Sequence, residues 1–194
     1  EIIAYEHSSV RPLDLQLFMD SQTYKNSDNM AFPVPDILGV NGSVALSIMQ
    51  ESGFPIEKLE RLEALRFFTL KGKYGSERKL MKESERTLLV VTGVIPSEAF
   101  SQLKFLHEAS QQQGLGKYER IIIKPHPGLP IDSTLIELDP EFNYEVVTEP
   151  ISNYWSQVDV VYCANSSGAS LEAAWLGIPL IVTSAINSMN LNPL

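Results

Sequence analysis

The chain has 194 residues, of which 44% are hydrophobic and 20% are charged. It is long enough to bury a core in one or two domains and too apolar to be intrinsically disordered. Its formal net charge of -9, from 24 acidic and 15 basic residues, disfavours nucleic acid or an anionic membrane surface as a partner. The single cysteine, Cys163, excludes an internal disulfide framework and a cysteine-rich zinc site, and its apolar neighbours predict a buried thiol.

The sequence carries no targeting or membrane-spanning signal. No apolar segment approaches the roughly 20 residues that a transmembrane helix needs, and the first residues lack the order of a signal peptide. We therefore expect a cytoplasmic protein. Because the chain opens on Glu1 rather than Met, in what reads as a strand, we also expect it to be part of a longer protein.

The first region has an irregular α/β pattern. Strands are expected at residues 2–5 and 36–40, and helices at 43–51 and 56–65. A charged segment with two glycines, residues 71–86, is the best candidate for a linker. We place the boundary near Ser84, so that residues 1–84 end one domain and residues 85–194 form the next.

The second region alternates strands and helices regularly, which predicts a doubly wound parallel sheet of the Rossmann type. One helix should face the sheet with Phe100, Leu103, Leu106 and Ala109. The expected strands are 88–91, 120–123, 144–147, 159–163 and 180–182, and the expected helices are 97–113, 152–157 and 167–176.

Polar residues follow two of these strands. Lys124 and His126 follow one, with His126 fixed between two prolines, and a later strand runs into a turn that opens a helix. Ligands of parallel sheets bind outside the carboxyl ends of strands, and a helix N-terminus favours phosphate. We therefore predict a phosphate site, whose turn residues are Asn165, Ser166, Ser167 and Gly168.

Each of these residues also has a purely structural interpretation. His126 could be satisfied by a neighbouring carbonyl, Lys124 could pair with a surface carboxylate, and a serine before a helix is the usual N-cap. Glu172, in the following helix, could accept from the ribose hydroxyls of a nucleotide or be a solvated charge. The aspartates show no metal-ligand spacing and no Asp-x-Asp motif, so no metal is predicted.

These motifs resemble the C-terminal half of a GT-B glycosyltransferase, most closely bacterial surface-carbohydrate enzymes of the sialyl-, Kdo- and glycerophosphotransferase type. Those enzymes carry a His-Pro pair after one strand and a Ser-rich turn after a later one, here His126-Pro127 and Ser166-Ser167. The resemblance implies that both contact the phosphates of a nucleotide-activated donor. It also implies that the loop containing Pro150 and Ile151 frames the nucleobase.

A weaker resemblance concerns the N-terminal region. Tyr5-Glu6-His7-Ser8-Ser9 resembles the Gln-His-Gly or Gln-His-Ser turn of the same enzymes, which faces the interdomain cleft, although Glu6 replaces the glutamine. This makes His7 a candidate catalytic residue. The resemblance otherwise leaves the catalytic base to the N-terminal domain, so the isolated chain could lack activity.

The implied activity is the metal-independent and cofactor-independent transfer of a sugar or polyol phosphate from a cytidine or uridine nucleotide. The acceptor would be a glycan or a lipid-linked glycan of lipopolysaccharide or capsule synthesis, met in the cytoplasm or at the inner membrane face by a peripherally associated full-length protein. One alternative is a non-hydrolysing UDP-sugar 2-epimerase, whose Asp-Ser-Gly-Gly turn and following Glu-Glu-Ala are matched with departures at Asn165, Ser167 and Leu171. Another is a non-catalytic module that binds a nucleotide or a protein.

Overall fold

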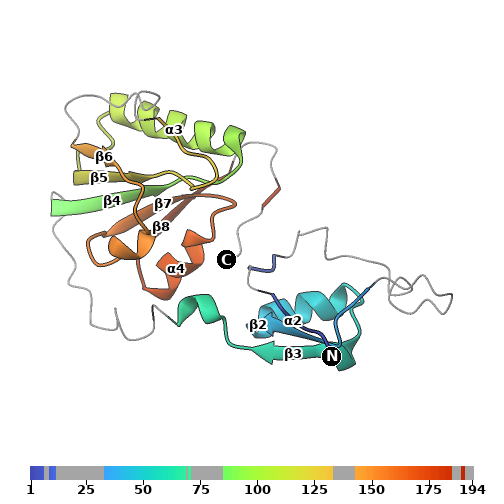
Figure 1. The fold of residues 1–194 in the computed structure, drawn as a ribbon. Helices are drawn as coiled ribbons and strands as arrows, with labels where there is room; N and C mark the ends of the chain where they lie inside the picture. The colour runs from blue at the N-terminus through green and yellow to red at the C-terminus, as the bar shows by residue number, and fades with distance from the viewer. Residues whose placement is uncertain are drawn as a thin grey trace. The chain divides into compact units, whose positions relative to one another are not determined.

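The computed structural model describes residues 1–6, 9–11, 33–68, 70, 85–132, 143–184 and 189–190. The chain divides into two compact units, Glu1–Lys73 and Tyr74–Asn192. One contains a three-stranded and the other a five-stranded sheet (Figure 1), and all the strand pairs are parallel. The predicted α/β class with Rossmann-like parallel sheets is confirmed. Ser84 lies outside the described residues, and the division at 84/85 stays a prediction.

The first unit is a small βαβ arrangement. Its elements are β1 (Ile3–Tyr5), β2 (Ile37–Asn41), α2 (Gly42–Glu51), the 3-10 helix η2 (Ile56–Lys58), β3 (Leu59–Leu62) and the 3-10 helix η3 (Leu65–Phe67). The helix α2 follows β2 without a loop because Gly42 adopts a φ of 82°, which only glycine reaches without strain. The core beneath it contains Val40, Ala45, Ile48, Met49 and Phe54.

The predicted helix at residues 56–65 is wrong. Leucines at positions 59, 62 and 65 imitate helical spacing, but residues 59–62 form β3 and pair with β2, with Leu59 opposite Leu38. Pro55 starts the segment in an extended conformation, with ψ of 116°, and only one 3-10 turn precedes the strand. Pairing with an existing strand therefore outweighed the local helical preference.

The second unit contains the elements expected for a doubly wound fold. They are β4 (Arg86–Val91), α3 (Pro96–Gln111), β5 (Tyr118–Lys124), β6 (Tyr144–Val146), the 3-10 helix η6 (Ile151–Asn153), β7 (Val160–Ala164), α4 (Ala169–Trp175) and β8 (Leu180–Thr183). The predicted strands and the two longer helices are confirmed, with ends shifted by a few residues. The predicted helix at 152–157 is wrong, because only η6 forms there and turns follow it.

The strand order β6-β5-β4-β7-β8 places β4 at the centre. The chain builds outward from β4 through β5 to β6 and then returns to the other side of β4 as β7. The topological switch point therefore lies between β4 and β7, where the connections after the two strands leave in opposite directions. Gln102 of α3 ties the two strands together, since its side-chain amide donates to the Val91 carbonyl at 3.2 Å and to the Tyr162 carbonyl at 3.1 Å.

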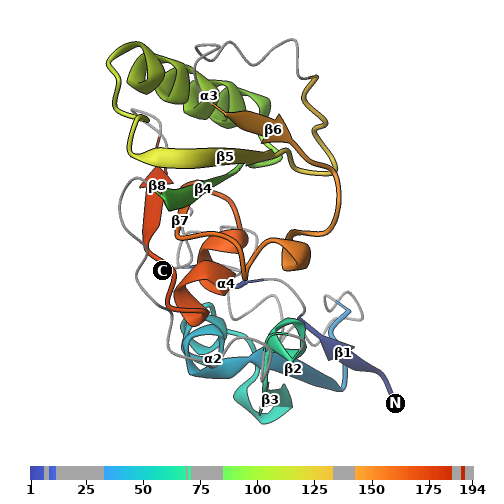
Figure 2. The same ribbon diagram turned by 90° about the vertical axis from the view of Figure 1, so that its left-hand side faces the viewer.

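The helices α3 and α4 lie on opposite faces of the five-stranded sheet (Figures 1 and 2). Alternate strand residues thus enter different layers. The α3 layer contains Leu88, Val90, Ala99, Leu103, Leu106, Leu115, Ile121, Ile123 and Ile131. Phe100, predicted to face the sheet, is 49% exposed, because the buried stripe of α3 runs through Ala99, Gln102, Leu103 and Leu106 instead.

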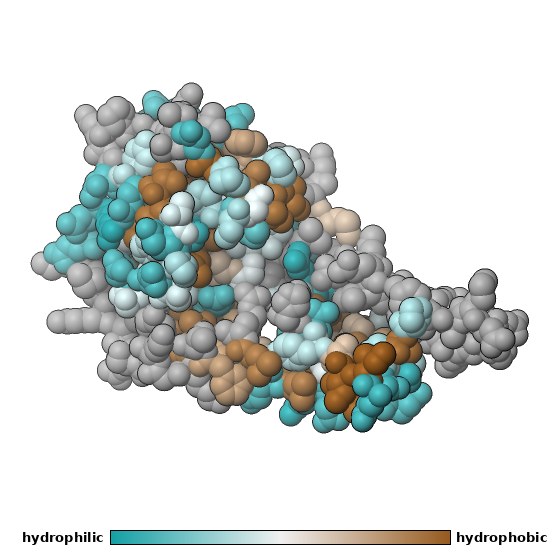
Figure 3. Space-filling model, viewed as in Figure 1, coloured by the Kyte–Doolittle hydropathy of each residue, from teal (hydrophilic) through white to brown (hydrophobic). Residues whose placement is uncertain are grey.

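Hydrophobic residues also reach the surface of the second unit, scattered between hydrophilic ones (Figure 3). Besides Phe100 they include Trp175 on α4 and Ile181 on the edge strand β8, which is 47% exposed. The other edge strand, β6, carries Glu145, whose carboxylate pairs with Arg120 of β5. One edge strand of the sheet, β8, thus exposes a hydrophobic side chain, whereas the other, β6, carries a charged one.

The fully buried Ile122 of β5 and the exposed Ile181 of β8 give a matched test of this packing. We expect Ile122→Ala to lower the free energy of unfolding of the second unit by about 2–5 kcal/mol, and Ile181→Ala by less than about 1 kcal/mol. Both tryptophans, Trp155 and Trp175, lie in this unit, so tryptophan fluorescence during urea unfolding reports on it selectively. Equal losses for the two variants would contradict the assigned layers.

Candidate functional site

Three connections meet at the carboxyl edge of the five-stranded sheet. Thr92 and Gly93 follow β4, His126 follows β5, and the turn 165–168 follows β7. The strands β5, β4 and β7 are adjacent in the sheet, so their carboxyl ends lie next to one another. This edge includes the switch point, which is where ligands of open α/β sheets bind.

His126 is held in one orientation. Its backbone N–H donates to Thr92 Oγ1 at 3.1 Å, and its ring Nδ1 accepts from the Gly128 backbone N–H at 3.0 Å. Because Nδ1 is the acceptor, the proton of the neutral imidazole lies on Nε2, where the ring can donate. The residue is exposed, and among the described residues Nε2 has no hydrogen-bond partner.

Thr92, which the sequence analysis did not single out, organises this loop. It is fully buried directly after β4, and its N–H donates to the Lys124 carbonyl at 3.2 Å, which continues the β4–β5 ladder beyond the strands. Its hydroxyl then accepts from the backbone of His126. The sequence signal that could have identified Thr92 is its position as a polar residue immediately after a buried strand.

Lys124 is only 6% exposed, which differs from the surface ion pair considered as its structural alternative. Its Nζ donates to the Thr148 carbonyl at 3.2 Å and to the Pro125 carbonyl at 3.4 Å. The ammonium thus ties the end of β5 to the loop after β6, which leads to Pro150 and Ile151. Its role as a phosphate ligand stays a prediction.

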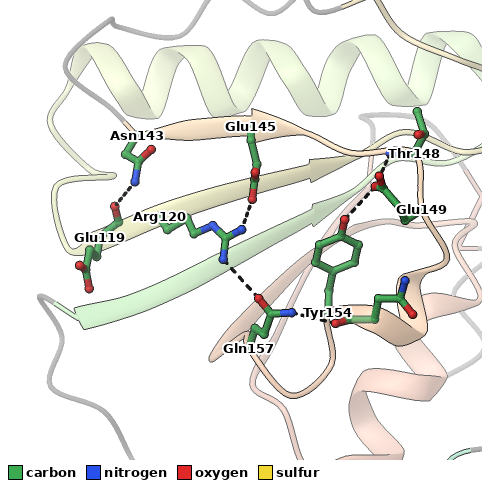
Figure 4. Close-up of polar contacts among 9 residues, drawn as sticks. Glu119, Arg120, Asn143, Glu145, Thr148, Glu149, Tyr154 and Gln157 are labelled. Carbon is green, nitrogen blue, oxygen red and sulfur yellow. Dashed lines mark hydrogen bonds and ion pairs between the residues drawn. The ribbon is translucent and has the colours of Figure 1, made fainter.

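The loop after β6 is braced by further polar contacts (Figure 4). The Tyr154 hydroxyl donates to the Glu149 carboxylate at 2.9 Å, and Arg120 donates to the Gln157 side chain at 3.3 Å. Hydrogen bonds from the Glu149 backbone and from Tyr154 lower the pKa of the Glu149 carboxyl. Within this loop Pro150 is exposed and Ile151 is half-buried at the start of η6. Their contact with a nucleobase stays a prediction.

The turn after β7 uses much of its polarity internally. Asn165 is buried and its side-chain amide donates to the Met189 carbonyl at 2.8 Å. The Ser167 hydroxyl accepts from the N–H of Ala169, the first residue of α4, at 3.3 Å, whereas the N-cap position of this helix is Gly168. Gly168 directly precedes the helix and is half-buried. The Ser167 hydroxyl thus bonds locally but is not the N-cap that the sequence suggested, and phosphate contacts of this turn stay predictions.

Ser166 contacts a residue that sequence reasoning missed. Its backbone N–H donates to Glu98 Oε1 at 3.0 Å, and its hydroxyl donates to Glu98 Oε2. Glu98 is the third residue of α3, so this contact spans the switch point from the connection after β4 to the turn after β7. An acid in the first turn of a helix is common because it complements the helix dipole, so the sequence carried no signal for this pairing.

Gly93 makes this contact sterically feasible. A Cβ at this position would lie 2.7 Å from Ser166 Oγ, 2.8 Å from Glu98 Oε2 and 3.2 Å from the Ala164 Cβ. The first two distances are too short for a side chain at position 93 while Glu98 and Ser166 keep these positions.

Glu172, the predicted ribose ligand, lies in α4 and accepts the indole N–H of Trp155 at 3.1 Å. Trp155 is fully buried, so this carboxylate gives the indole N–H a hydrogen-bond partner in the core. Burial, together with the charge of Glu172, raises the pKa of the neighbouring Cys163 thiol to about 12. The ribose role of Glu172 stays a prediction.

The remaining candidate, His7, lies outside the described residues. Within the described ranges, no group of three or more His, Cys, Asp or Glu side chains is arranged to hold a metal ion. A helix with both the length and the apolar character needed to cross a bilayer is absent from the same ranges.

No protein-family model and no curated protein sequence matches this chain. Among solved structures, it is similar to the crystal structure of Anabaena Alr3699/HepE in complex with UDP and glucose, at 11% sequence identity and a TM-score of 0.48. The match covers 94% of this chain and 52% of the other, so this chain spans about half the length of that protein.

The close approach at Gly93 predicts a specific stability loss. We expect Gly93→Ala to lower the free energy of unfolding of the second unit by about 1–3 kcal/mol, because the methyl group must displace Glu98 or Ser166. Gly116→Ala is the matched control, since its nearest contact is at an ordinary 3.4 Å, and its loss should stay below about 1 kcal/mol. Urea unfolding followed by tryptophan fluorescence measures both, and an unchanged Gly93→Ala protein would refute the contact.

Cys163 should be chemically inert in the native protein. With a pKa of about 12, its thiolate fraction at pH 8 is only about one in ten thousand, and burial blocks access as well. We expect an aromatic disulfide reagent to release about one thiol equivalent per chain only after denaturation in guanidinium. Rapid labelling of the native protein would show that β7 is not buried as described.

Proposed function

We propose that the second unit binds the phosphate of a nucleotide-activated sugar or polyol phosphate donor, and that the chain is part of a metal-independent GT-B glycosyltransferase of surface-polysaccharide synthesis. The observation that carries the proposal is the fixed imidazole of His126. Two hydrogen bonds set its orientation, and they leave Nε2 as a donor at the carboxyl edge of the sheet. The His-Pro and Ser-Ser pairs of the sequence support the family assignment.

The chemistry follows from where charge develops. With a sugar donor, the bond between the anomeric carbon and the phosphate oxygen breaks; with a polyol phosphate donor, the bond between the transferred phosphorus and the bridging oxygen breaks. In both cases the electron pair stays on the leaving nucleoside phosphate. The acceptor hydroxyl forms the new bond to that carbon or phosphorus and releases its proton to a base, which we assign to the N-terminal domain. A hydrogen-bond donor aimed at the phosphate oxygen stabilises the transition state, in which negative charge builds up on that oxygen, more than it stabilises the ground state. Transfer is therefore accelerated without a metal.

The surroundings of His126 suit this role because they limit its motion. Thr92 anchors the backbone before the ring, and the Gly128 N–H anchors the ring itself. The imidazole therefore loses little conformational freedom when it binds, and an already oriented donor contributes more of its interaction energy to affinity. Lys124, by bonding to the Thr148 carbonyl, would hold the loop that contains Pro150 and Ile151, the expected nucleobase contacts, beside the same edge of the sheet.

Nucleotide binding should depend on His126. We expect the chain to bind a cytidine or uridine nucleotide in calorimetry, and His126→Ala to weaken binding by about 10–100-fold, the loss of one charge-assisted hydrogen bond. His126→Gln should retain part of the affinity, because its amide can replace the Nε2 donor.

The matched control is His107→Ala. His107 lies in the second half of α3, which runs back toward the amino ends of the strands, so its loss should leave binding unchanged within about twofold. Circular dichroism and tryptophan fluorescence establish that each variant is folded. Absence of binding of CMP, CDP, UDP, GDP and ADP to a folded chain would refute the proposal and favour a non-catalytic module.

A further inference from the structure

Glu98 places a carboxylate on the turn that a donor phosphate would use. Both of its oxygens are engaged by one residue, Ser166, through the backbone N–H at 3.0 Å and through the hydroxyl. Glu98 is 9% exposed, and in the described part of the chain no lysine or arginine pairs with it. A buried carboxylate held by an N–H and an O–H is bound as an anionic ligand would be.

The contact between Glu98 and Ser166 lies at the switch point of the sheet. Glu98 belongs to α3, which follows β4, whereas Ser166 belongs to the turn after β7, so the carboxylate bridges the switch point. Gly93 leaves no spare room beside it, since even a Cβ there would lie within 2.8 Å of Glu98 Oε2 and of Ser166 Oγ. An incoming phosphate therefore cannot reach the Ser166 donors while Glu98 occupies them.

We propose that Glu98 is an internal competitor of the donor phosphate, which occupies the Ser166 donors in the free protein and leaves when the phosphate binds. This inference rests on the proposed function. Two anions cannot share the same pair of donors, so binding at Ser166 exchanges one for the other. Glu98 then lowers the affinity for every ligand that places a phosphate on this turn.

The exchange requires only a side-chain movement. Glu98 is the third residue of a helix of 16 residues, and the first backbone bond of this helix, from the Ala99 N–H to the Ile95 carbonyl at 3.0 Å, does not involve its side chain. Rotation about its side-chain torsions can move the carboxylate away from Ser166 without unwinding α3. Ligands without a phosphate would not compete with it, so Glu98 lowers the affinity for nucleotides and leaves the affinity for nucleosides unchanged.

Glu98→Gln tests the proposal because it removes the charge while it retains the size. We expect Glu98→Gln to bind CDP or UDP at least about fivefold more tightly than the unmodified chain, within the range usual for coupling between competing ligands. Binding of cytidine and uridine should not change. Glu108→Gln is the matched control, because it makes the same charge change on the same helix at a residue whose only described ion pair is an exposed one with Lys104 at 3.9 Å.

Ser166→Ala identifies the donors for which the two anions compete. In the Glu98→Gln background, Ser166→Ala should abolish at least half of the gain in affinity, whereas a general charge effect would persist. Glu98→Ala serves as a second variant if the glutamine keeps both contacts. Isothermal calorimetry on the full 194-residue chain gives all affinities, with circular dichroism as the check on folding.

The outcomes separate this inference from the proposed function. Tighter nucleotide binding by Glu98→Gln or Glu98→Ala than by the unmodified chain supports the competitor role. Nucleotide binding that depends on His126 but is unchanged or weakened in both Glu98 variants overturns the competitor role alone. Absence of nucleotide binding in the unmodified chain and in both variants overturns both proposals.

Discussion

The parallel pairing of β4 along both of its edges is the constraint on which the second unit depends. Its pairing with β5 on one side and with β7 on the other brings segments some forty residues apart in sequence to one sheet edge. Gln102 of α3 reinforces the arrangement by donating hydrogen bonds to carbonyls of β4 and β7. The loops that carry His126 and Ser166 are positioned only because this central strand fixes the order of its neighbours.

The fold of this unit was largely predictable because its strands are short continuous apolar runs and its helices are bounded by Pro and Gly. Errors arose where local pattern and tertiary pairing disagree. The leucines of residues 59–65 have helical spacing, yet the available edge of β2 recruits Leu59–Leu62 as a strand. Phe100 fitted the predicted apolar stripe, but α3 buries Ala99 against the sheet in its place. The polar Gln102 is also buried, because its side-chain N–H groups find strand carbonyls as acceptors.

The candidate site was predictable in outline and not in its connections. Sequence spacing located His126 and the Ser166-Ser167 turn after two strands, because polar residues that end buried strands are conspicuous. It could not reveal that Thr92 receives the His126 N–H or that Glu98 receives Ser166, since both contacts join segments that are distant in sequence. Glu172 shows the same limit, because only the three-dimensional arrangement brings the buried Trp155 indole to its carboxylate.

The unequal edges of the five-stranded sheet have a consequence for self-association. At β6 the strand is three residues long and carries the charged Glu145, a combination that discourages another chain from adding to the sheet. At β8 the strand Leu180–Thr183 carries no charge, its Ile181 and Val182 are 47% and 37% exposed, and β7 is its one strand partner in the described part of the chain. The free backbone edge of β8 is therefore the side of this sheet on which a further strand, native or misfolded, would extend the hydrogen-bond ladder, and charged substitutions there would act as gatekeepers against aggregation.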